Sequence, residues 1–460
     1  MATGIQESSS TVRDLIQQSE LISKGSPARR CLLTTRSDLY EDVSVRKWTF
    51  GQRDINMRNK IVLMVGETGT GKTTLINAMT NYILGVKFTD KVWFEITEEG
   101  GENQSNQSKS QTNKVTVYEV FTQYNPICLT IIDTPGYGDT RGTENDKQVI
   151  ENLYKLFHND SGVKEIDAVC LVLKASENRV SDRLQYIFDA VLSLFGKDIE
   201  NNIVMFVTHS DGLPPTNALN AIQKAGIPCR KNDDNEPEHF LFNNRQREKR
   251  SLKYDRVFQT AWEQTEDSFN DFFTSLKEQN RKSLKNTESV MKESIRLEAC
   301  ILNLQNRIEF IECKSKELTQ IQKALEENRE MIKRNKNFPF TCWCYVMKNK
   351  HWTVCTGNKR EEELITTEKK LKEEICEKEK EKAELVEEAY NTIMTLYEIA
   401  LKPDSAFIVQ SLDFLIPRAE ETGREDLVQR LREMRKIQPE AEERVKAVTW
   451  YGRSSFNSEK

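Results

Sequence analysis

Residues 61–75 read IVLMVGETGTGKTTL, and this stretch decides the fold of the first half of the chain. The five apolar residues from Ile61 to Val65 are typical of a strand that is buried on both faces of a largely parallel sheet. Gly66 to Thr73 then fits the pattern G-x-x-x-x-G-K-[ST], and a helical pattern follows from Leu75 to Leu84. A strand, a glycine-rich loop and a helix in this order predict a loop whose backbone N–H groups bind phosphate oxygens.

The polar groups of this phosphate loop have distinct expected roles. Lys72 is expected to reach the β- and γ-phosphates of a nucleotide, and Thr73 to place its hydroxyl on Mg²⁺. The glycines let backbone N–H groups approach phosphate without obstruction by a Cβ, and the helix N-terminus adds a favourable dipole. The predicted nucleotide-binding residues of the loop are Gly66, Glu67, Thr68, Gly69, Thr70, Gly71, Lys72, Thr73 and Thr74.

Further strands and helices alternate after the loop and predict an α/β domain with a mostly parallel sheet and helices on both faces. Residues 115–121 and 127–132 are expected to form a hairpin that gives the sheet an antiparallel edge. The other expected strands are 168–173, 203–208 and 240–242, and the expected helices are 146–156, 181–194 and 217–224. We place this domain at residues 57–255, behind a polar extension at 1–56 that we expect to be partly disordered.

The second half of the chain has the pattern of long helices. Apolar residues recur at steps of four and three from Leu297 to Ile311, which is typical of a coiled-coil seam, and a second helical stretch runs from about Arg360 to Leu401. We therefore expect a helical hairpin at 256–402 with an aromatic, cysteine-bearing insert at 336–358. Residues 403–460 are expected to hold two short helices, 407–415 and 426–434, separated by Pro417 and Gly423, and a disordered tail.

Composition limits the classes of partner. The chain has 460 residues and a formal net charge of -5, which argues against a dominant nucleic-acid surface. It has no apolar run of the ~20 residues that a membrane-spanning helix needs, and the first residues do not read as a signal peptide. The 10 cysteines are then expected to be mostly reduced thiols of a cytoplasmic protein.

A second phosphate contact is predicted at DTPG, residues 133–136. An apolar strand delivers Asp133 to the site, where its carboxylate would hold Mg²⁺ through water, and Gly136 would offer its backbone N–H to the γ-phosphate. Lys72, Thr73 and Gly136 are the predicted catalytic groups. Ras-like enzymes carry Gln at the next position, whereas this chain has Tyr137, so we expect slow hydrolysis in the lone chain.

Recognition of the base is predicted at the end of another apolar strand, where the chain reads Thr208-His209-Ser210-Asp211. The Asp211 carboxylate would accept hydrogen bonds from the guanine N1 and N2 groups, which adenine lacks. Thr208 and His209 stand where the Asn-Lys-x-Asp motif of GTPases has Asn and Lys, and His209 is expected to stack on the base. The motif therefore favours GTP over ATP.

Three stretches resemble the GTPase of immunity-associated protein (GIMAP) family over about residues 58–250: DTPGYGDT at 133–140, LFGKDIENNIVMFVTHSDGL at 194–213 and HFLFNNRQ at 239–246. The YGD after DTPG also resembles septins, in the same TRAFAC branch of GTPases. The resemblance implies binding of GTP and GDP with Mg²⁺, low intrinsic hydrolysis, and nucleotide-dependent pairing into a homodimer or larger assembly through the nucleotide face.

The same resemblance implies further site residues. Asn243 or Asn244 would lie near the base, and Gln104 to Lys114 would be the first switch. Thr112 is the preferred Mg²⁺-side hydroxyl, with Ser105, Ser108, Ser110 and Thr116 as alternatives. The predicted metal-binding residues are thus Thr73, Thr112 and Asp133.

The insert at 336–358 admits two interpretations. Cys342, Cys344, His351 and Cys355 are close enough in sequence for a tetrahedral zinc site. The aromatic residues around them would instead form an apolar plug, which we favour because structural zinc sites usually have more regular ligand spacing. Aromatic residues beside Lys348 and Lys350 would also suit peripheral contact with a membrane.

Two functions compete at the level of sequence. The first is a slow GTPase switch that assembles when it binds GTP and engages protein partners through its coiled-coil arm. The second is a coiled-coil scaffold whose nucleotide domain binds GTP and GDP without significant turnover. An ATP-driven coiled-coil machine fits poorly, because such proteins carry their second nucleotide motif after the coiled coil and Asp133 precedes it.

Overall fold

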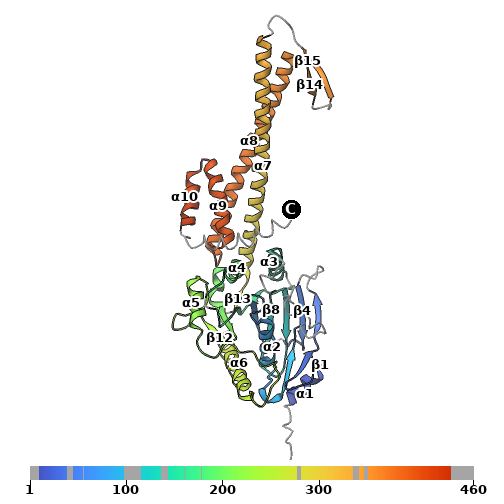
Figure 1. Cartoon of the computed structure of the whole chain (residues 1–460), viewed down its shortest axis with the longest axis vertical. Coiled ribbons are helices and arrows are strands. Elements are labelled where there is room, and N and C mark those ends of the chain that lie inside the picture. The colour runs from blue at the N-terminus through green and yellow to red at the C-terminus, as the bar shows by residue number, and fades with distance from the viewer. Residues whose placement is uncertain are drawn as a thin grey trace, which may run out of the picture. The chain divides into compact units, whose positions relative to one another are not determined.

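The computed structural model describes residues 10–38, 45–54, 56–97, 115–135, 143–159, 161–177, 179–276, 281–334, 341–346 and 351–436 (Figure 1). They divide into two compact units. The first unit holds the described residues up to Lys292 together with Tyr397–Val409. The second unit holds Glu293–Leu396 and the described residues from Gln410 onward.

An eight-stranded sheet forms the centre of the first unit, with strand order β12-β11-β10-β5-β8-β7-β4-β3. Neighbouring strands pair in parallel except for β7 with β8 and β3 with β4, so the predicted, mostly parallel α/β sheet is confirmed. The strands are β3 (Thr35–Asp38), β4 (Val45–Phe50), β5 (Arg58–Val65), β7 (Val115–Val120), β8 (Ile127–Asp133), β10 (Ala168–Lys174), β11 (Ile203–Thr208) and β12 (His239–Leu241).

Each central strand is apolar on both faces because helices cover the sheet on both sides. Leu63 and Val65 of β5 face a core that includes residues of three helices: α3 (Thr143–His158), α4 (Asp182–Leu192) and α5 (Thr216–Lys224). Val62 and Met64 face a second core built with α1 (Ser10–Gln17), α2 (Lys72–Ile83) and α6 (Asp255–Ser275). Alternate residues of one strand thus fill two cores, as expected for side chains that alternate across a sheet.

Smaller elements complete the first unit. A three-stranded sheet consists of β1 (Ser19–Ser23), β2 (Ala28–Leu32) and β6 (Val92–Glu95). The short strands β9 (Glu165–Ile166) and β13 (Lys282–Ser283) pair antiparallel. Two 3₁₀ helices lie at η1 (Phe88–Asp90) and η3 (Lys197–Asn202).

The N-terminal segment differs from the polar extension that we expected to end at residue 56. β4 pairs in parallel with β7, so the β7–β8 hairpin does not form the edge of the sheet. The pattern of β4 hides this role, because Arg46 and Lys47 alternate poorly with the buried Val45 and Phe50. Contacts between polar side chains help to hold the strand: the Lys47 ammonium lies 2.9 Å from the carboxylate of Glu119 on β7.

The second unit contains the predicted helical hairpin. α7 (Lys285–Arg334) and α8 (Gly357–Ile399) run antiparallel, as shown by ion pairs that link residues rising along α7 to residues falling along α8. These pairs are Arg296–Glu388, Arg307–Glu381 and Arg329–Glu361, with separations of 2.9, 2.7 and 2.7 Å. Between the two helices, β14 (Thr341–Val346) and β15 (His351–Thr356) form an antiparallel ribbon in which Cys342 pairs with Cys355.

Two helices depart from the expected pattern. α6 (Asp255–Ser275), which we assigned to the helical hairpin, belongs to the first unit because its aromatic face packs into a core of the sheet. α9 (Ala406–Glu421) continues through Pro417, which was expected to end it, and α10 (Glu425–Lys436) follows. Leu415 and Ala419 on either side of the proline are fully buried, and their packing compensates for the hydrogen bond that proline cannot make.

No helix within the described ranges is long and apolar enough to cross a membrane.

A buried ion network ties the sheet to the segment that leads into α7. The Asp167 carboxylate accepts hydrogen bonds from the Lys60 ammonium at 3.3 Å, the Ile61 backbone N–H at 2.8 Å and the Arg281 guanidinium at 2.9 Å. The Lys60 ammonium also donates to the carbonyl of Leu276 at 2.8 Å. Lys60 and Asp167 are both almost fully buried, so each charge depends on the other groups of the network.

Replacing Asp167 by Ala should lower the free energy of unfolding by about 3–5 kcal/mol, because it leaves the Lys60 ammonium buried without its carboxylate. Urea unfolding followed by tryptophan fluorescence measures the change. Glu165→Ala is the matched control: Glu165 pairs with the same arginine at 3.6 Å but is half exposed, so its loss should cost less than about 1 kcal/mol. Equal effects of the two substitutions would contradict the role given to the buried network.

Candidate functional site

The phosphate loop lies between the end of β5 and the first turn of α2, and its backbone needs glycine at three positions. A Cβ at Gly66 would lie 2.5 Å from the carbonyl oxygen of Val172, which is too close for any side chain. Gly69 and Gly71 have φ angles of +81° and +89°, in the region that disfavours residues with a Cβ. The loop is therefore a backbone cradle at a helix N-terminus, the arrangement that binds phosphate.

The Lys72 side chain is buried within this cradle. Its ammonium donates hydrogen bonds to the carbonyls of Gly66, at 2.5 Å, and of Glu67, at 3.0 Å. Burial lowers the pKa of Lys72 to about 8, against the opposing effect of the Asp133 and Glu67 carboxylates. At neutral pH the ammonium is still mostly charged, and a phosphate placed beside it would favour the charged form.

Asp133 stands at the end of β8, in the strand next to β5. It pairs in register with Met64, and the following residue, Thr134, donates from its hydroxyl to the Met64 carbonyl at 2.9 Å. The Asp133 carboxylate is buried and close enough to act on the charge of Lys72. Together with the hydroxyl of the half-buried Thr73 it supplies the hard oxygen donors that Mg²⁺ prefers, so these residues fit a magnesium ion.

The end of β11 lies against the phosphate loop. The buried Thr208 hydroxyl is 2.7 Å from the carbonyl of Thr70 and 3.2 Å from that of Leu173. A Cβ added at Gly71 would lie 4.0 Å from Nε2 of His209, so the imidazole borders the loop. His209 is exposed and has a φ of +54°, an unusual angle for a residue with a side chain.

The other predicted base-binding residues follow β11 and β12. Asp211 is exposed, and its carboxylate accepts a hydrogen bond from the Leu213 backbone N–H at 3.0 Å. The backbone N–H of Ser210 donates to the carbonyl of Phe242 at 3.1 Å, which brings the two strand ends together. Asn243 and Asn244 come directly after Phe242, and Oδ1 of Asn244 is buried without a hydrogen-bond partner among the described residues.

Sequence reasoning missed two contacts of this site. We treated Thr208 only as a replacement for Asn, whereas its hydroxyl connects the base-recognition segment to the phosphate loop. The Ser181 hydroxyl, which caps α4, also lies 3.5 Å from the carboxylate of Glu67. A polar residue at the end of a buried strand was a usable signal for the first contact, but no local pattern predicts the second.

Several predicted residues lie outside the described part of the chain. These are Gly136, Tyr137 and the first-switch segment 104–114 with Thr112. The backbone of Cys342, Cys344, His351 and Cys355 is described in β14 and β15, but their side chains are not. The zinc prediction for these four residues therefore stays a prediction.

Comparison with solved structures finds distant likenesses to Toc33 from Arabidopsis thaliana. Toc33 in complex with GDP and Mg²⁺ is 16% identical, covers 45% of this chain and 85% of its own, and gives a TM-score of 0.30. Toc33 in complex with Mg²⁺ and GMPPNP is 16% identical over 46% of this chain and 86% of its own, with a TM-score of 0.29. Likeness at this level does not transfer a function.

No curated protein sequence matches the chain at a significant level. Comparison with models of protein families gives a clearer result. The model of the AIG1 family matches residues 60–288, a stretch that begins at β5 and includes the phosphate loop, Asp133 and the β11 end. Residues 60–288 of this chain therefore form a GTP-binding domain of the AIG1 family.

Proposed function

We propose that this protein is a Mg²⁺-dependent, slowly hydrolysing GTPase that uses GTP and GDP to switch between assembly states. The observation that carries the proposal is the buried Lys72 ammonium, held by two loop carbonyls beside Asp133. A nucleotide phosphate would replace these carbonyls as the partner of the charge, and Thr73 with Asp133 would hold Mg²⁺. When bound, the ion supplies positive charge next to the β- and γ-phosphates.

Preference for guanine would come from groups at the ends of β11 and β12. The exposed Asp211 carboxylate has acceptor capacity beyond its contact with Leu213 and is suited to the N1 and N2 groups of guanine. The His209 ring borders the loop and would stack on the base. Asn244, whose buried Oδ1 has no partner among the described residues, would complete the pocket from β12.

Slow turnover follows from the residue after Gly136. A phenol at Tyr137 does not replace the amide that both donates to and accepts from an attacking water, so a partner must complete the site. We propose that a second copy of the chain does so, by pairing across the nucleotide face. The helical hairpin of α7 and α8 would then present its charged surface to other protein partners in a nucleotide-dependent way.

Asp211→Asn should exchange the base preference. The amide presents a donor where the carboxylate accepted, so affinity for GTP should fall at least tenfold and affinity for XTP, whose base carries a carbonyl at C2, should rise. Competition against a fluorescent nucleotide measures both. Lys72→Ala is the control that should lose both nucleotides, and equal affinity of the native chain for ATP and GTP would contradict guanine recognition.

Affinity for GDP should fall as the pH rises through about 8, because the unbound loop then loses the proton of Lys72. Bound phosphates raise the pKa of the ammonium, so binding above this pH takes up a proton. We expect about tenfold weaker binding at pH 9 than at pH 7. Calorimetry in buffers of different ionisation enthalpy counts the protons, and Lys72→Arg, which stays charged, should take up none. A pH-independent affinity of the native chain would contradict the buried state of the lysine.

The rate of phosphate release per molecule should rise with protein concentration, since pairing completes the site. A steady-state phosphate assay over a wide range of concentration, read together with light scattering, measures the rate and the assembly state. A rate that stays at background in the assembled form would instead favour the coiled-coil scaffold. Thr73→Ala serves as the control for contaminating activity.

A further inference from the structure

The ribbon of β14 and β15, between the two long helices of the second unit, carries three cysteines on one of its faces (Figure 1). Successive residues of a strand alternate between the two faces, and residues directly opposite each other in an antiparallel pair share a face. Cys342 is paired with Cys355, and Cys344 lies two residues further along β14. The register therefore places all three cysteines on the same face of the ribbon.

The aromatic residues of the ribbon occupy the other face. Trp343 lies between Cys342 and Cys344 in sequence, and Tyr345 is paired with Trp352. By the same alternation these three residues share the face opposite to the cysteines. An apolar plug and a metal site are thus not alternatives for this segment, because the residues that each would use belong to different faces.

His351 shares the face of the cysteines but lies too far along the ribbon to join them. It is paired with Val346 and is four residues from Cys355 on the same strand. At about 3.3 Å per residue, the two backbone positions are ~13 Å apart. All ligand atoms of one zinc ion lie within ~2.3 Å of it, so His351 and Cys355 are too distant to share an ion.

The three cysteines are close enough together to bind one ion. Directly opposite residues, such as Cys342 and Cys355, have Cβ atoms ~5 Å apart, and the diagonal neighbours Cys344 and Cys355 are roughly 7 Å apart. Two residues along one strand are separated by ~6.6 Å. Sulfur atoms on one tetrahedral zinc ion are ~4 Å apart, because each Zn–S bond is ~2.3 Å long. The choice of cysteine rotamers covers the remaining difference.

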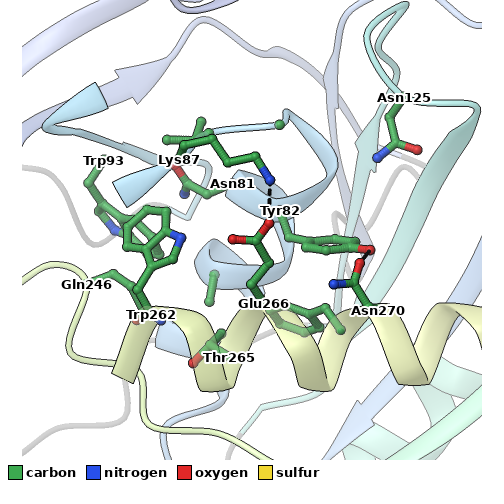
Figure 2. A pocket seen from close by; sticks show the side chains of 14 residues that line it. Asn81, Tyr82, Lys87, Trp93, Asn125, Gln246, Trp262, Thr265, Glu266 and Asn270 are labelled. Atoms are coloured by element: carbon green, nitrogen blue, oxygen red, sulfur yellow. Dashed lines mark hydrogen bonds and ion pairs between the residues drawn. The ribbon is translucent and has the colours of Figure 1, made fainter. Parts of the chain in front are cut away.

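A ribbon of two strands also needs support, because an isolated pair of strands is marginally stable at best in water. In the first unit, aromatic residues are supported by a core: the rings of Trp93 and Trp262 lie edge to face with centroids 6.0 Å apart, and these residues are only 1% and 7% exposed (Figure 2). Packing of the ribbon through its aromatic face would leave the cysteine face without such support. A metal ion bound by both strands would supply it.

We propose that Cys342, Cys344 and Cys355 bind one Zn²⁺ ion as thiolates, with a water molecule at the fourth position. Thiolate sulfur is a preferred ligand of this ion, whereas the proposed Mg²⁺ site of the nucleotide domain is made of oxygen donors. Each thiol releases its proton to solvent when the ion binds. Cys355 is two residues before Gly357, the first residue of α8, so the ion would also close the segment that joins α7 to α8.

Metal titration of the full chain tests this site. Chain stripped of metal and kept under a reductant, with Mg²⁺ in excess, should bind one equivalent of Zn²⁺ with a dissociation constant below about 1 μM. Co²⁺ in place of Zn²⁺ should give a thiolate-to-metal charge-transfer band in the near ultraviolet. Absence of that band, or a Cys342–Cys355 disulfide that persists in the presence of Zn²⁺ and reduced glutathione, would overturn the proposal.

Serine substitutions identify the ligands. Cys342→Ser, Cys344→Ser and Cys355→Ser should each weaken Zn²⁺ binding at least tenfold and, at saturating Co²⁺, lower the charge-transfer band by about a third. Cys313→Ser is the matched control, because Cys313 is an exposed free thiol of α7, and it should leave affinity and band unchanged. An equal loss in the control would show that binding is not specific to the ribbon and would overturn the proposal.

Two further variants separate this site from other interpretations. His351→Ala should bind Zn²⁺ as the native chain does, and a tenfold loss of affinity would contradict the three-cysteine ligand set. Lys72→Ala should lose nucleotide binding and keep the charge-transfer band. A failure of the proposed GTP site and a failure of the zinc site are therefore told apart.

Discussion

The burial of the Lys72 ammonium is the constraint on which the rest of the first unit depends. A charge taken out of water must meet polar groups at short range, and the carbonyls of Gly66 and Glu67 provide them. These carbonyls turn inward only because Gly69 and Gly71 adopt positive φ angles and because Gly66 fits against Val172 on β10. The parallel pairing of β5 with β8 and β10 thus helps to position the Lys72 side chain.

Hydrogen bonds from neighbouring strands keep this geometry in place. Thr208 links the end of β11 to Thr70, and Thr134 links the end of β8 to Met64. Both bonds lie at the carboxyl ends of parallel strands, where ligand sites of open α/β sheets are found. At the opposite ends of the strands, the carboxylate of Asp167 accepts hydrogen bonds from Lys60 and Arg281. Polar contacts therefore stabilise the sheet at both ends of its strands, and apolar packing stabilises it between them.

The parts of the fold that sequence reasoning found are those with a strong local signal. β5, β10 and β11 are continuous apolar runs because both of their faces are covered, and the phosphate loop follows a fixed pattern. The strand β4 was missed because its half-buried arginine and lysine interrupt any period of two. α9 was cut short at Pro417 because a local rule was applied where tertiary packing decides. At the site, the contact between Ser181 and Glu67 joins residues 114 apart in sequence, which no local pattern reveals.

The segment after α8 returns to the first unit. The backbone N–H of Leu401 donates to Phe195 at 2.8 Å, and the buried Lys402 pairs with Asp189 of α4 at 3.0 Å. Gly196 contacts both the segment that leads into α7 and the segment that follows α8. Ala400 forms an isolated β-bridge with it, and a Cβ on Gly196 would lie 2.9 Å from Cβ of Asn286 in the first turn of α7. Residues 293–396 of the second unit are thus an insertion, and the segments before and after it both contact Gly196. A protease that cuts between β14 and β15 would produce two polypeptides, each still anchored in the folded nucleotide domain, and the nicked molecule would stay in one piece.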